Sequence, residues 1–144
     1  MVDFGYVGDV DSVNGKMLST LIEAGITPIM APLTHNGEGD ILNTNADTIA
    51  SETAKALAAV GYDVTLIYSF EKAGVLSKPD DDNSVIPVIT RPDFERYVAD
   101  GTIGGGMIPK VENALAAVDA GVSRVIITLA TAIDGNSGTV ISPL

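Results

Sequence analysis

Cysteine is absent from the 144-residue sequence, and histidine occurs once. Without cysteine the chain has no disulfide framework and no thiol chemistry, and one histidine cannot make a histidine-rich metal cluster. That histidine, His35, precedes Asn36 and Gly37, which favour a turn. We therefore interpret His35 as a solvated turn residue rather than a catalytic base, and we expect no protein-bound metal.

Basic residues are scarce: 8 Lys and Arg face 19 Asp and Glu, for a formal net charge of -11. Nucleic acids and anionic membranes both need a basic face on the protein that binds them. This balance argues against either as a partner. A site for a phosphate-bearing ligand must therefore depend on a few local charges.

Long apolar runs are also missing, since none approaches the roughly 20 residues of a membrane-spanning helix. The N-terminus lacks a basic segment followed by an apolar core, so we expect a cytoplasmic protein. The composition is 46% hydrophobic, which is enough for a core, and 144 residues is the size of one domain. We predict a single domain over residues 1–144.

Three polar side chains of similar chemistry, Asn43, Asn45 and Asp47, lie within five residues and lead into a predicted helix. Asn and Asp are favoured at helix starts, where their oxygens accept from unpaired backbone N–H groups. This explanation needs no function. However, Asp47 falls on the alanine side of the helix, marked by Ala50 and Ala54, where another element can approach closely. A carboxylate there favours a cationic partner.

The candidate for that partner is Lys110, which follows the glycine run at residues 104–106 in a second predicted helix. The expected buried stripe of this helix is Met107, Val111, Ala114, Leu115 and Val118. A lysine beneath glycines at a helix N-terminus suits phosphate binding. The alternative is an ordinary lysine whose stem lies along an amphipathic helix.

The motif N-x-N-A-D at residues 43–47, followed by G-G-M-I-x-K ending at Lys110, resembles the amino acid kinase family, and most closely its N-acetylglutamate kinases. The resemblance covers nearly the whole chain but only the second half of the family's chain. It implies an α/β fold with a mainly parallel sheet flanked by helices (an αβα sandwich) and no N-terminal lobe. Residues 1–144 would then be a C-terminal ATP-binding domain.

The resemblance also implies the chemistry: ATP would phosphorylate the side-chain carboxylate of N-acetyl-L-glutamate, in arginine biosynthesis. Lys110 would lie against the transferred phosphoryl group, Asp47 would orient the lysines, and Asn43 and Asn45 would hold the N-acylglutamate. The acceptor carboxylate is already ionised, so no general base is required. Mg²⁺ would be carried on the ATP phosphates without a dedicated protein cage.

The family's nucleotide loop corresponds here to SFEKAGVL, residues 69–76. Gly74, Val75 and Leu76 match the family pattern, while Glu71 replaces its aspartate and Phe70 and Lys72 depart from it. The nucleotide-binding residues that the resemblance implies are Glu71, Gly74, Val75, Leu76, Ile103, Gly104, Gly106 and Met107.

The remaining elements alternate as expected for an α/β sheet. We predict an extended segment at residues 1–13, helices at 14–24 and 91–100, and a hairpin turn at 34–40. Strands are predicted at 26–33, 63–70, 84–90 and 123–130, with Pro87 favouring a sheet edge. The three aspartates at 80–82 form a solvated turn. The family's helix before the terminal strand at Gly138 and Thr139 is missing.

The N-terminal lobe of the family supplies a second lysine, a glycine-rich phosphate loop and the acyl pocket, so this chain alone should be inactive. The missing lobe and a second copy of the chain are its candidate protein partners. Two alternatives remain: a kinase for N-succinylglutamate, and a non-catalytic nucleotide-binding or interaction module. A dinucleotide oxidoreductase is disfavoured, because the glycine run lacks the G-x-G-x-x-G order.

Overall fold

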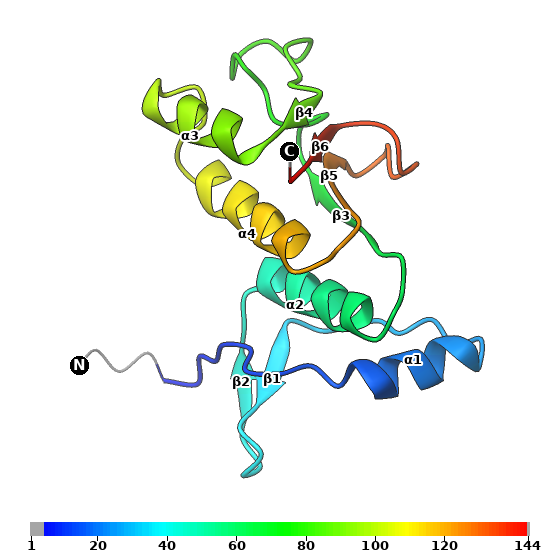
Figure 1. Ribbon diagram of the computed structural model, residues 1–144. Helices are drawn as coiled ribbons and strands as arrows, with labels where there is room; N and C mark the ends of the chain where they lie inside the picture. Colours follow the sequence, from blue (N-terminus) through cyan, green and yellow to red (C-terminus); the bar gives the residue numbers. More distant parts are fainter. Residues whose placement is uncertain (1–4, 144) are drawn as a thin grey trace. The chain divides into compact units, whose positions relative to one another are not determined.

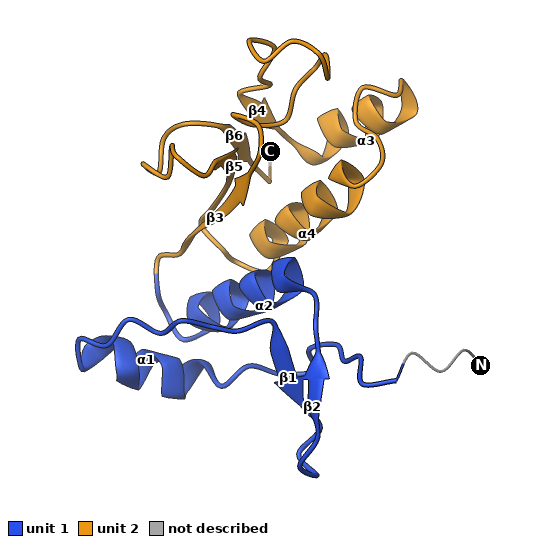
Figure 2. Cartoon of the chain, turned by 180° about the vertical axis from the view of Figure 1, so that it is seen from behind, with its two compact units in different colours: residues 1–62 blue, residues 63–144 orange. Residues whose placement is uncertain are grey.

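A computed structural model of the protein describes residues 5–143 (Figure 1). The chain divides into two compact units, residues 1–62 and residues 63–144 (Figure 2). Unit 1 contains α1 (Gly15–Glu23), β1 (Leu33–His35), β2 (Ile41–Asn43) and α2 (Ala46–Ala59). Unit 2 contains β3 (Thr65–Phe70), β4 (Val88–Ile89), α3 (Arg91–Ala99), α4 (Met107–Asp119), β5 (Arg124–Leu129) and β6 (Thr139–Ile141).

In unit 1 the two helices pack closely because a glycine lies at their contact. Asn14 caps α1 by accepting from the backbone N–H of Met17 at 2.9 Å, as expected for an asparagine at a helix start. A Cβ atom on Gly15, the next residue, would lie 2.7 Å from the carbonyl oxygen of Ala56 in α2. A larger residue at position 15 would therefore push the helices apart.

Strands β1 and β2 form the predicted hairpin, with Leu33 opposite Asn43. The turn is closed by Asn36, whose Oδ1 accepts from the N–H groups of Glu38 at 2.8 Å and Asp40 at 3.2 Å. His35 is exposed, as expected, but it is the last residue of β1 rather than a turn residue. Its Nδ1 accepts from the N–H of Gly37 at 3.1 Å. The extended segment predicted at residues 1–13 makes one parallel bridge, from Val7 to Asn43, and residues 1–4 lie outside the described part.

The buried strand predicted at residues 26–33 is wrong. Ile26 and Met30 are about half exposed and Ile29 is 94% exposed. Only Leu33 joins a strand, and residues 26–32 pair with no strand among residues 5–143. An apolar, β-branched sequence fits a strand only when neighbouring strands bond its backbone on both sides. Within the described chain those neighbours are missing.

Unit 2 is built on a four-stranded sheet in the order β3-β5-β6-β4. β3 pairs with β5 and β4 with β6 in parallel, while β5 and β6 are antiparallel. Helix α4 packs against β5 and β6 and buries Val111, Ala114, Leu115, Ala117 and Val118 (Figure 1). The prediction of an α/β fold with a mainly parallel sheet flanked by helices is confirmed. β4 lies at the edge of the sheet, where Pro87 was expected.

Helix α3 begins with a capping box, in which Thr90 and Asp93 exchange hydrogen bonds with each other's backbone N–H groups. The Thr90 hydroxyl also donates to the Asp93 carboxylate at 2.7 Å, and this bond, together with the one from the Thr90 backbone N–H, lowers the pKa of Asp93. Residues 130–138 contain no helix, as expected from the sequence. There Asp134 accepts from Ser137 and from the N–H of Asn136, and its pKa falls to about 2. In residues 5–143 no helix is long and apolar enough to cross a membrane.

A buried threonine on β6 ties the loop after β3 to the sheet. Thr139 is fully buried, and its hydroxyl accepts from the N–H of Val75 at 2.8 Å and donates to the carbonyl of Ile86 at 2.7 Å. A Cβ on Gly74 would lie 2.7 Å from the same hydroxyl oxygen. Glycine at position 74 therefore lets the loop come close enough for the bond to form.

We predict that Thr139→Val lowers the free energy of unfolding by about 1–3 kcal/mol, because the near-isosteric change leaves a buried N–H and a buried carbonyl unpaired. Urea denaturation measures this. Thr65→Val is the matched control: Thr65 is an exposed residue of β3, so the same substitution should have little effect on stability. Equal losses in the two variants would contradict the role given to the Thr139 hydroxyl.

Candidate functional site

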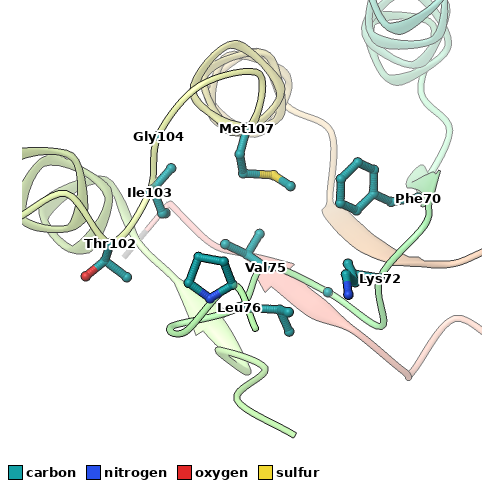
Figure 3. A pocket seen from close by; sticks show the side chains of 10 residues that line it. Phe70, Lys72, Val75, Leu76, Thr102, Ile103, Gly104 and Met107 are labelled. Carbon is teal, nitrogen blue, oxygen red and sulfur yellow. The ribbon is translucent and has the colours of Figure 1, made fainter. Parts of the chain in front are cut away.

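A cavity of about 230 Å³ opens in unit 2 between the loop after β3 and the loop before α4 (Figure 3). Its lining residues come from these two loops and the residues beside them: Phe70, Lys72, Gly74, Val75, Leu76, Pro79, Thr102, Ile103, Gly104 and Met107. Ligand sites usually begin at about 300 Å³. The cavity is therefore sized for a ring system rather than for a whole drug-sized ligand.

The walls of this cavity are mainly apolar. Val75 and Ile103 are each 2% exposed, and Met107 extends from α4 into the space between Ile103 and Phe70 (Figure 3). Lys72 is the charged residue of the lining, and it forms an ion pair with Asp82 at 2.8 Å. The hydrogen bond from Lys72 to Asp82 raises the pKa of the lysine. An apolar slot with one polar end can bind a flat ring by its faces.

The structure brings six of the expected nucleotide-binding residues together around this cavity: Gly74, Val75, Leu76, Ile103, Gly104 and Met107. Glu71 and Gly106 are exposed and do not line it. The sequence interpretation missed Phe70, Lys72, Pro79 and Thr102. Phe70 and Lys72 were visible only as departures from the family pattern.

The glycine run before α4 is not required by packing. A Cβ added at Gly104 or Gly106 would meet no described atom within 4 Å, so the backbone there is open to a ligand. In the first turn of α4, however, the N–H groups of Met107 and Ile108 already donate to the carbonyls of Gly104 and Gly105. Some backbone N–H groups of this turn are therefore already hydrogen-bonded within the chain. Binding of an anion here would depend more on the positive charge of Lys110.

Lys110 lies over two aromatic rings of β3. Its Nζ is 5.1 Å from the ring centroid of Tyr68 and 5.8 Å from that of Phe70. Tyr68 and Phe70 are two residues apart on one strand, so their side chains share one face of the sheet. Lys110 is not among the lining residues of the cavity, but Phe70, whose ring it lies over, is one of them.

The expected substrate residues lie in unit 1. Asn45 caps α2, with its Oδ1 accepting from the N–H groups of Asp47 at 2.8 Å and Thr48 at 3.2 Å. Asn43 is an exposed residue of β2, fixed by backbone bonds to Tyr6 and Gly8. The helix-cap explanation is thus confirmed for Asn45. Asp47 belongs to unit 1 and Lys110 to unit 2, so their pairing stays a prediction.

Unit 1 has a second cavity of about 440 Å³, bordered by residues 9–14, the hairpin and α2. His35 lines it, and so does Thr53, whose hydroxyl oxygen is buried without a hydrogen-bond partner among the described residues. Asn43, Asn45 and Asp47 are not among its lining residues. Within residues 5–143 no group of three His, Cys, Asp or Glu side chains is placed to hold a metal ion.

Comparison with known proteins places this geometry in a family. Residues 2–129 match the model of the amino acid kinase family. The chain is 64% identical over 140 residues to an acetylglutamate kinase of Phocaeicola vulgatus, covering 97% of this chain and 54% of that protein. It is 63% identical over 138 residues to an acetylglutamate kinase of Bacteroides thetaiotaomicron, covering 96% of this chain and 53% of that protein.

Solved structures agree with these relatives. The crystal structure of smu.665 from Streptococcus mutans superposes with a TM-score of 0.78 at 36% identity, covering 98% of this chain and 53% of that chain. Carbamate kinase of Giardia lamblia bound to AMP-PNP gives a TM-score of 0.64 at 25% identity, covering 90% of this chain and 44% of that chain. The chain spans about half the length of the curated relatives it matches. It belongs to the amino acid kinase family.

Proposed function

We propose that this chain is the nucleotide-binding half of an ATP-dependent acetylglutamate kinase. The enzyme would transfer the γ-phosphoryl group of ATP to the side-chain carboxylate of N-acetyl-L-glutamate, as a step of arginine biosynthesis in the cytoplasm. The observation that carries the proposal is the apolar cavity of unit 2 with the Lys110 ammonium beside it. The names of the relatives and the AMP-PNP complex of carbamate kinase support it.

In this proposal the adenine ring occupies the cavity between Val75, Ile103 and Met107. The phosphates then extend toward Lys110. Phosphoryl transfer requires mainly positioning and positive charge on the oxygens where negative charge accumulates. Lys110 would supply that charge, and Mg²⁺ would be carried by the nucleotide phosphates.

The acceptor needs no base, since its carboxylate is ionised near neutral pH. Asn43 and Asn45 would hold the acyl-amino acid by neutral hydrogen bonds. Because the oxygen of Asn45 already caps α2, its NH₂ group is the part that would donate to the substrate. Asp47 would orient the lysines around the phosphoryl group.

A further lobe would complete the enzyme. The proposal gives it the second lysine, the glycine-rich phosphate loop and the acyl pocket. Its support is the coverage of about half of each relative, together with the exposed apolar residues Ile26, Ile29 and Met30 in the unpaired segment of unit 1. By itself the chain would bind nucleotide weakly and show no turnover. The alternative is a non-catalytic nucleotide-binding module. Such a module would bind nucleotide in the same cavity but would bind no acceptor for the phosphoryl group.

We predict that Mg-ADP binds the 144-residue chain and that Lys110→Ala weakens binding about tenfold or more, because a charged contact to phosphate is lost. Isothermal titration calorimetry measures both affinities. Lys78→Ala is the control, since it removes the same charge from an exposed turn of the same unit. If Lys110→Ala binds as tightly as the wild type, Lys110 is only a packing residue of α4.

We expect the full-length protein that carries this sequence to phosphorylate N-acetyl-L-glutamate with ATP. The reason is that the asparagines of this chain recognise amide and carboxylate groups, while the acyl pocket would lie in the other lobe. A coupled ADP-release assay with N-acetyl-, N-succinyl- and free glutamate compares the acceptors. If the enzyme prefers N-succinylglutamate, the proposed substrate is wrong. If it phosphorylates none of the three, the alternative of a non-catalytic nucleotide-binding module stands.

The proposed Asp47–Lys110 unit gives a further test in the full-length protein. If Asp47 acts only at the helix start, Asp47→Asn should cost about 1 kcal/mol or less of stability and leave turnover near normal. If Asp47 orients the lysines, turnover should fall about 10²-fold or more while the fold stays intact. Turnover and thermal unfolding are measured on the same preparations.

The double variant separates these explanations further. Asp47→Asn combined with Lys110→Ala should be much less damaging than the product of the two single losses, because residues that act as one unit are not additive. Asp63→Asn, an exposed carboxylate outside the helix, serves as the control. Two independent, multiplicative losses would contradict the pairing.

A further inference from the structure

We propose that Tyr68 and Phe70 are positioning residues that form an aromatic platform for Lys110 and hold its ammonium group beside the cavity. This inference rests on the proposed nucleotide site and adds residues that the family motifs do not include. The distances carry it: 5.1 Å and 5.8 Å from the Lys110 Nζ to the two ring centroids. Both lie within the roughly 6 Å over which a ring face attracts a cation.

The platform is fixed by the sheet. Tyr68 is 3% exposed and pairs in register with Ile127 of the buried strand β5. Phe70 ends the same strand, opposite Leu129, and its ring reaches the cavity wall (Figure 3). One ring is therefore held in the core, and the other faces both the ammonium and the expected position of a bound ring.

Aromatic rings suit this task for an electrostatic reason. A ring face attracts an ammonium through its quadrupole but carries no formal charge, so it does not neutralise the charge that the lysine offers to phosphate. Lysine has a flexible four-carbon stem and loses rotamer freedom when it binds. Holding the ammonium over two rings before the ligand arrives reduces that loss.

The double contact of Phe70 makes the proposal specific. If Phe70 served only as a wall of the cavity, its loss would lower the affinity for every ligand that places a ring there. If Phe70 also positions Lys110, its loss must weaken the binding of a phosphate-bearing ligand more than the binding of the same ligand without phosphates. The ratio of the affinities for Mg-ADP and adenosine therefore separates the platform from simple packing.

The experiment uses calorimetry on the 144-residue chain with Mg-ADP and with adenosine. Phe70→Leu should lower the affinity for Mg-ADP about three- to tenfold more than the affinity for adenosine, which is the range expected for a cation–ring contact. Phe70→Tyr keeps the ring face and should restore the wild-type ratio. Phe94→Leu makes the same change in the buried face of α3 at a residue that does not line the cavity, and it should leave the ratio unchanged.

Two more measurements decide the outcome. In the Lys110→Ala background, Phe70→Leu should weaken both ligands equally. In NMR spectra of the ligand-free chain, ring currents should shift the Lys110 side-chain protons upfield, and Phe70→Leu should reduce that shift. Absence of the shift in the wild type overturns the platform, whether or not nucleotide binds.

The failures of the two proposals differ. If Mg-ADP binds through Lys110 but Phe70→Leu weakens both ligands equally, the platform is wrong and the nucleotide site stands. If the NMR shift is present and the wild-type chain binds neither ligand, the nucleotide site is wrong. The platform then has no phosphate to position and is overturned with it.

Discussion

The hydrogen bonds of the Thr139 hydroxyl are the constraint on which the site in unit 2 depends. One buried oxygen on β6 joins the loop at Val75 and the segment at Ile86, which lie 64 and 53 residues from Thr139 in the sequence. Burial makes these bonds obligatory, since an unpaired N–H or carbonyl there is costly. Gly74 is needed because any side chain would enter the space of that hydroxyl. The position of the cavity wall at Gly74 and Val75 is thus set by the buried Thr139.

This anchoring explains why the loop tolerates an altered sequence. The matching residues Gly74, Val75 and Leu76 are those held against the sheet or along the cavity. Phe70 and Lys72 depart from the family pattern at positions whose side chains reach the cavity from its rim. The backbone path can be kept while the chemistry of the rim changes. The Lys72–Asp82 ion pair and the ring of Phe70 are two such changes.

Local signals made several helices of both units predictable from the sequence. The periodicity of α4 predicted most of its buried stripe, although Met107, expected on that stripe, is half-buried and lines the cavity. Asn14 and Asn45 were recognisable as residues of helix starts. The segment at residues 26–32 was not predictable in the same way, because a strand exists only with neighbours that bond its backbone. Its apolar sequence favoured a buried strand, but the described chain contains no strand that pairs with it. Cavity residues such as Thr102 and Pro79 carry no local signal, since tertiary folding alone brings them together.

The acidity of the chain gives Lys110 its importance. With a net charge of -11, this chain repels a nucleotide phosphate at long range, and screening in salt weakens but does not reverse this. Attraction must then come from a cation held close to the phosphate at a fixed place. Part of the backbone donor capacity at the start of α4 is used by Gly104 and Gly105, which increases the demand on the side chain. In the proposed site, a lysine positioned over uncharged rings would meet that demand, because the rings restrict its orientation without adding a negative charge beside it.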